Sequence, residues 1–152
     1  MIKWKNLIIS ILIPNVLGFL GSLIGNVQNG FEGITKPSFT PPALVFPIAW
    51  TILYILMGIS TYIIYESNSK EKSKSLIIYG IQLILNASWT FFFFNLNWFF
   101  FSFILVIIIL ILVIIMIYKF YNINKTAAYL QLPYVLWLIF AAILSYNVYL
   151  LN

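Results

Sequence analysis

The stretch from Leu76 to Tyr118 reads LIIYGIQLILNASWTFFFFNLNWFFFSFILVIIILILVIIMIY and contains no charged residue. A helix needs about 20 mainly apolar residues to cross the hydrocarbon core of a bilayer. The stretch is long enough for two such helices, and Asn95-Leu96-Asn97 provides a tight turn between them. Since a surface in contact with water rarely exposes so many apolar side chains in a row, the stretch predicts a membrane-embedded chain.

The composition of the whole chain supports this prediction. Hydrophobic residues make up 63% of the 152 residues and charged residues only 7%, whereas roughly a quarter of the residues in a typical globular domain are charged. We therefore expect one all-α integral membrane domain covering residues 1–152. The hydropathy pattern divides it into five spans, at residues 6–27, 43–65, 76–94, 98–120 and 126–151.

The lysines are distributed unequally between the two sides of this predicted bundle. Seven of them fall on one side: Lys3, Lys5, Lys70, Lys72, Lys74, Lys119 and Lys125. Lys36 alone falls on the other side. Because cytoplasmic loops carry an excess of Lys and Arg, the N-terminus is predicted to be cytoplasmic, and the first loop and the C-terminus to lie outside the cell membrane. This orientation explains the net charge of +5 better than binding to nucleic acid does.

The first apolar run resembles a signal peptide because Lys3 and Lys5 precede it. It continues to about Val27 without an A-x-A-like site, so it is predicted to be retained as the first helix. Gly21 and Gly25 form a small-xxx-small pair within it. Such a pair allows close helix approach, and we expect it to serve packing within the chain rather than a dimer seam.

The residue inventory excludes several kinds of chemistry. Cys, His, Asp and Arg are absent, which leaves Glu32, Glu66 and Glu71 as the only carboxylates. A Ser-His-Asp triad, a Cys-His pair and a zinc site are therefore unavailable within one chain. We predict no metal site, no acid–base catalytic residue and no required cofactor.

Three predicted helices each carry a Trp together with small or polar residues at helical spacing. These faces are Trp50, Tyr54, Met57 and Thr61; Gln82, Asn86, Trp89 and Phe93; and Tyr134, Trp137, Ala141 and Ser145. One interpretation is that the rings and amides only pack and bond between helices. The other is that they line a pocket for a flat, apolar, polarisable ligand. Trp4 and Trp98, at span ends, are predicted to be interfacial anchors.

Several segments of the chain resemble one known family. The first is Lys36-Pro37-Ser38-Phe39-Thr40-Pro41-Pro42, followed by the segment from Val45 to Tyr54. The others are Tyr79 to Asn86, Leu132 to Trp137 and the terminal Leu150-Leu151-Asn152. In this order they are similar to the TspO/MBR family, also known as the translocator protein, tryptophan-rich sensory protein or peripheral-type benzodiazepine receptor family. The resemblance covers essentially the whole chain.

This resemblance implies a five-helix bundle with a pocket under the first loop. Members bind porphyrins and haem-like tetrapyrroles, in some cases sterols, and synthetic benzodiazepine-type drugs, and they are often dimeric. The resemblance implies a pocket lined by Trp50, Asn86, Trp89 and Trp137, with Tyr54, Phe93 and Ala141 as supporting wall. In the loop, it implies contributions from Phe31, Phe39, Pro41 and Pro42.

The chain departs from the family pattern at two places. The first loop of bacterial relatives usually carries Trp where this chain has Gly30-Phe31 and Phe39, so stacking is kept while the indole N–H donor is lost. The cholesterol-recognition pattern of animal members needs a basic residue after a central Tyr, and none follows Tyr146. Sterol binding is therefore not the expected native role.

The leading hypothesis is a membrane receptor that binds porphyrin or haem and senses or scavenges it, with the lipid bilayer and a second copy as further partners. Recognition is predicted to depend on ring stacking on Trp50, Trp89 and Trp137, with Asn86 orienting the ligand. One alternative is light- and oxygen-dependent porphyrin degradation, with Trp50 and Trp137 as redox-active neighbours. A transporter of small hydrophobic molecules and a purely structural membrane role are the others. General acid–base catalysis is disfavoured because no titratable residue lies in the predicted pocket.

Overall fold

The protein is described by a computed structural model of residues 1–152, and all of its regular elements are helical. The elements are α1 (Trp4–Ile24), η1 (Val27–Asn29), α2 (Val45–Tyr65), α3 (Lys72–Thr90), η2 (Phe91–Asn95), α4 (Phe99–Ile123), α5 (Lys125–Tyr129) and α6 (Leu132–Leu151). Five helical segments are long and apolar enough to cross a membrane: α1, α2, α3 with η2, α4, and α5 with α6. The predicted number of five spans is confirmed.

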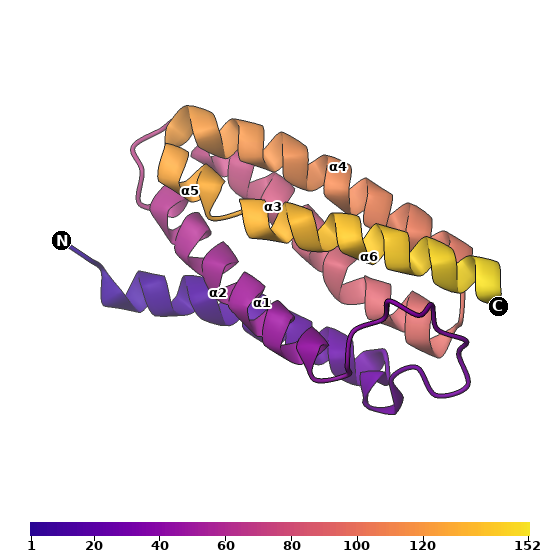
Figure 1. Cartoon of the computed structure of the whole chain (residues 1–152). Helices are drawn as coiled ribbons and strands as arrows, with labels where there is room; N and C mark the ends of the chain where they lie inside the picture. Colours follow the sequence, from indigo (N-terminus) through magenta and orange to yellow (C-terminus); the bar gives the residue numbers. More distant parts are fainter.

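The helices form a closed ring around one core. α1 packs against α2 and α3, α4 packs against α3 and α6, and α5 closes the ring against α2. The N-terminus lies at one end of the bundle, and the first loop and the C-terminus lie together at the other end (Figure 1). This arrangement makes that second end the place where a loop can cover the space between the helices.

Helix boundaries differ from the predicted ones at polar ends. α3 begins at Lys72, four residues before the expected start, and in its first turn the Ser75 hydroxyl donates to the Glu71 carbonyl (3.0 Å). The Lys72 ammonium also donates to the Tyr65 carbonyl at the end of α2 (2.9 Å). Hydropathy alone misses such a start, because a short polar turn of helix outside the bilayer has no apolar signal.

The fifth span is interrupted rather than continuous. The Asn124 side chain accepts a hydrogen bond from the Ala127 amide (3.1 Å) and caps α5, a favoured role for Asn. α5 ends at Tyr129, and Pro133 lies in the first turn of α6, where its missing N–H costs no helical bond. The Ser60 hydroxyl on α2 donates to the Ala127 carbonyl (2.7 Å), so α5 is attached to α2.

Glycines set the close approach between α1 and its neighbours. A Cβ on Gly21 would lie 2.6 Å from the Ala87 carbonyl oxygen, and one on Gly25 would lie 2.6 Å from the Thr90 Cβ. The Thr90 hydroxyl also donates to the Gly21 carbonyl (2.7 Å). The predicted use of this glycine pair in packing within the chain is therefore confirmed, with α3 as the partner.

Candidate functional site

Trp50 and Trp137 lie against each other in the space between α2 and α6. Their ring centroids are 6.2 Å apart and nearly perpendicular. Trp50 also stacks on Tyr54 (5.4 Å) and meets the edge of Tyr134 (6.2 Å). α2 is held to α5, but its backbone hardly approaches α6, and the two helices separate toward the first loop (Figure 1). Aromatic rings from both helices fill the widening space.

A second aromatic pair lies at the end of α3. Trp89 stacks on Phe93 with centroids 4.6 Å apart, and the Trp89 indole N–H donates to the Ser102 carbonyl on α4 (3.1 Å). Phe93 belongs to the π-helix η2 and is fully buried. A π turn adds a residue to the turn and is frequent at functional sites. Here it directs Phe93 inward between Trp89 and the first loop.

Phe46 and Phe31 connect these two aromatic pairs. Phe46 on α2 lies 6.0 Å from Trp137 on one side and 5.8 Å from Phe31 on the other. Phe31, from the first loop, meets Phe93 (6.0 Å) and Phe94 (5.5 Å) edge to face. These rings lie in separate segments of the sequence, and the structure joins them into one aromatic site from α2, α3, η2, α6 and the first loop.

A chain of hydrogen bonds lies beneath the rings. The Tyr54 hydroxyl donates to the Asn86 Oδ1 (3.0 Å), the Asn86 Nδ2 donates to the Tyr134 hydroxyl (2.8 Å), and this hydroxyl donates to the Gln82 Oε1 (2.8 Å). All four side chains are buried. Asn86, predicted to orient a ligand, is thus bonded to α2 and α6 in this structure.

An apolar groove of about 340 Å³ lies beside Trp137. Its lining residues come from α2 and α6: Ala49, Ile52, Leu53, Pro133, Leu136 and Trp137. Ligand pockets for small molecules are typically roughly 300–1,000 Å³ and mostly apolar. The groove is therefore at the small end of that range, and Trp137 is the one aromatic residue in its lining.

The other predicted residues lie around this site. Ala141 is half-buried and packs against the core, one turn beyond Trp137 on α6. Phe39 meets Phe140 edge to face (6.5 Å) and is separate from Phe31. Pro41 and Pro42 lead the loop into α2, and the Pro42 carbonyl accepts from the Val45 amide (2.9 Å).

Three site residues were not selected from the sequence. Phe46 was included only in the family-like segment from Val45 to Tyr54, and Gln82 and Tyr134 only in the helix faces. Tyr134 is three residues from Trp137, and Gln82 is four from Asn86, so helical spacing was the signal that pointed to both. Phe46 precedes Trp50 by one turn, and the same spacing places it on that face.

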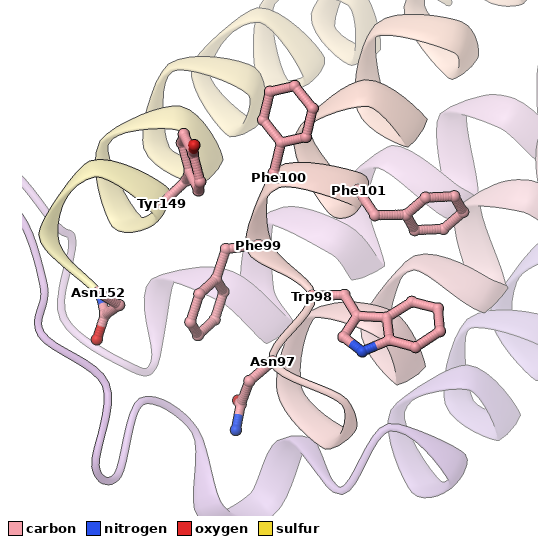
Figure 2. Close-up of a pocket in the computed structure, with 7 residues that line it drawn as sticks. All are labelled: Asn97, Trp98, Phe99, Phe100, Phe101, Tyr149 and Asn152. Carbon is pink, nitrogen blue, oxygen red and sulfur yellow. The ribbon is translucent and has the colours of Figure 1, made fainter.

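A second hollow, of about 380 Å³, lies outside the bundle at the same end. Its residues are Asn97, Trp98, Phe99, Phe100, Phe101, Tyr149 and Asn152. Trp98 and Phe101 lie together on one edge of the hollow, with ring centroids 6.0 Å apart. Phe100 and Tyr149 lie on another edge, with ring centroids 5.1 Å apart (Figure 2). Trp98 and Trp4 are more than half exposed at span ends, which agrees with their predicted role as anchors.

Together these features define a class: a multi-pass helical membrane protein whose ring of five spans encloses an aromatic, hydrogen-bonded site at the end covered by its first loop. The comparisons with known proteins identify the family. The TspO/MBR family model matches residues 10–151, and the chain belongs to the TspO/MBR family.

Named relatives resemble the chain over most of its length. The "Tryptophan-rich protein TspO" of Archaeoglobus fulgidus is 39% identical over 148 residues, which cover 96% of each chain. The "Translocator protein" of Sus scrofa is 30% identical over 143 residues, covering 91% of this chain and 85% of its own. The "Tryptophan-rich sensory protein" of Cereibacter sphaeroides is 29% identical over 122 residues, covering 80% of this chain and 76% of its own. The family resemblance found in the sequence is confirmed.

Proposed function

We propose that this protein is a membrane receptor that binds a tetrapyrrole, porphyrin or haem, in the aromatic site under its first loop. The observation that carries the proposal is the contact between Trp50 and Trp137, at 6.2 Å, in the space where α2 and α6 separate. Indole faces are suited to stacking on a flat conjugated macrocycle, and the groove beside Trp137 is lined mostly by apolar residues, as ligand pockets usually are.

The role that fits this site best is sensing or scavenging of the ligand. Relatives are named sensory, tryptophan-rich and translocator proteins, which favours a receptor over an enzyme. The chain contains no His or Cys, so only less usual ligands such as Tyr or Met could hold a haem iron axially. Binding is therefore expected to depend on stacking, with similar affinities for metal-free porphyrin and haem.

Titration of the detergent-purified protein with protoporphyrin IX tests the proposal. We compare the wild type with Trp50→Ala/Trp137→Ala and with the control Trp4→Ala/Trp98→Ala, whose indoles are exposed at span ends. Trp89 remains in all three proteins and reports binding by fluorescence quenching. Saturable quenching in the wild type and the control, weakened at least tenfold in the site variant, is expected. Equal quenching in all three proteins would exclude the site.

A second candidate function is light-dependent breakdown of the bound porphyrin in the presence of oxygen. The observation that favours it is the proximity of four oxidisable rings, since Trp50 contacts Trp137, Tyr54 and Tyr134. To test whether the Trp137 indole takes part, the porphyrin complexes of wild type and Trp137→Phe are illuminated in air, and the rates at which the porphyrin bleaches are compared. Identical bleaching rates would argue against it.

A further inference from the structure

The side-chain amide of Asn152 holds the first loop by two hydrogen bonds. The Thr35 amide N–H donates to the Asn152 Oδ1 (3.0 Å), and the Asn152 Nδ2 donates to the Thr35 carbonyl (3.0 Å). The same Nδ2 donates to the Val148 carbonyl on α6 (2.8 Å). The primary amide thus pairs with both backbone groups of one loop residue, Thr35, and its third bond fixes it to the helix.

The same loop inserts Phe31 into the aromatic site. Gly30 and Gly33 flank it with φ of +53° and +75°, values that glycine adopts at little cost, so the chain can turn sharply on both sides of the ring. Phe31 then packs among Phe46, Phe93 and Phe94. The Lys36 ammonium lies 5.8 Å from the centroid of the Phe31 ring, which adds a cation–π contact.

The position of Phe31 conflicts with a large ligand in the site. Phe31 lies between Phe46 on α2 and the two rings of η2, Phe93 and Phe94, outside the groove beside Trp137. A macrocycle that reaches both Trp137 and Trp89 must displace this ring. The loop has to move before such a ligand can enter from its side.

We propose that the Asn152–Thr35 amide pair locks the first loop shut, with Phe31 as a plug, and so controls access to the aromatic site. The gating part rests on the proposed function, since it needs a ligand. The lock itself does not depend on the proposed function, and hydrogen exchange measures it without any ligand. Asn152 thereby acts as a regulatory residue without touching the ligand.

Hydrogen exchange of the ligand-free protein tests the lock. Asn152→Ala removes both bonds to Thr35, whereas the control Asn147→Ala removes an amide that bonds only within α6, to the Ile143 carbonyl (2.8 Å). The informative amides are Ile34 and Thr40, which donate to Phe31 and Pro37 and not to Asn152. If the loop is held as a unit, both exchange about tenfold faster in Asn152→Ala, the effect of losing about 1.4 kcal/mol. A change confined to Thr35 would overturn the lock.

Stopped-flow mixing with protoporphyrin IX tests the gate. Asn152→Ala is expected to bind about tenfold faster than wild type, by the same loss of hydrogen bonding, and Asn147→Ala at the wild-type rate. Equal rates in a protein whose loop exchanges faster would overturn the gate. Absence of binding in all three proteins would instead reject the proposed ligand, and the exchange data would still decide the lock.

Discussion

Single polar side chains connect the helices of this bundle. Asn86 joins α3 to Tyr54 on α2 and, together with Gln82, to Tyr134 on α6. A buried polar group left without a partner costs about 1–3 kcal/mol, so the amide is bonded in the absence of ligand. Its predicted part in orienting a ligand stays a prediction, and such a part would require an exchange of hydrogen-bond partners.

Glu66 makes a comparable connection at the opposite end. The Lys3 ammonium (2.6 Å) and the side-chain Nδ2 of Asn6 (2.6 Å) both donate hydrogen bonds to the Glu66 carboxylate. These bonds hold the pKa of the Glu66 carboxyl below its ordinary value of 4.5. Because the folded-state pKa is lowered, this contribution to stability is present above about pH 4.5 and is lost as the pH falls through the folded-state pKa. We expect the melting temperature of Glu66→Gln in detergent to be below that of wild type at pH 7, with a gap that closes toward pH 3.

Glu71→Gln is the control, since the Glu71 carboxylate lies 3.4 Å from Lys74 on the exposed surface. Exposed pairs of this kind contribute little to stability. If Glu66→Gln and wild type lost the same stability over this pH range, the Lys3–Glu66–Asn6 contact would have no part in holding α1 to α2.

Helix pairs depend on positions without a side chain. On α2, Gly58 faces α1 so closely that an added Cβ would collide with the Ile11 backbone and lie 2.7 Å from the Ser10 carbonyl oxygen. Backbone atoms cannot move aside as a flexible side chain can, so the two helices would have to separate. The α1–α2 contact therefore depends on this glycine.

Gly58→Ala and Gly80→Ala form a matched pair of substitutions within helices. Nothing lies within 4 Å of a Cβ on Gly80, so Gly80→Ala is expected to be neutral or to stabilise by up to about 1 kcal/mol through helix propensity. Gly58→Ala is expected to destabilise by about 1–3 kcal/mol through overpacking. Thermal unfolding in one detergent, followed by Trp emission, measures both. Equal stability of the two variants would contradict the close α1–α2 packing.

For the whole molecule, the membrane orientation is a prediction, because it rests on seven lysines at one side of the bundle and one, Lys36, at the other. The first loop and the N-terminus lie at opposite ends of the bundle (Figure 1), so they face opposite sides of a bilayer that the bundle crosses. The aromatic site then opens, under its loop, on the outer side of the membrane. Dimerisation, which the family implies, also stays a prediction.

The absence of Cys makes this orientation easy to measure. Lys36→Cys and Lys70→Cys each introduce a single thiol, in the first loop and in the α2–α3 connector. We expect a membrane-impermeant maleimide to label Lys36→Cys in intact cells and Lys70→Cys only after permeabilisation, because the lysine excess stays on the cytoplasmic side in both variants. The reverse labelling would place the aromatic site on the cytoplasmic side.

The sequence by itself determined the five spans, the loop that joins the first two and the faces that carry Trp50, Asn86 and Trp137. These are local properties, because hydropathy and the 3.6-residue period are set by neighbouring residues. Only the tertiary structure decided the ring order of the helices, the attachment of α5 to α2, the insertion of Phe31 and the pairing of Thr35 with Asn152. Each of these depends on contacts between residues far apart in the chain, and no periodic pattern in a single segment encodes such a contact.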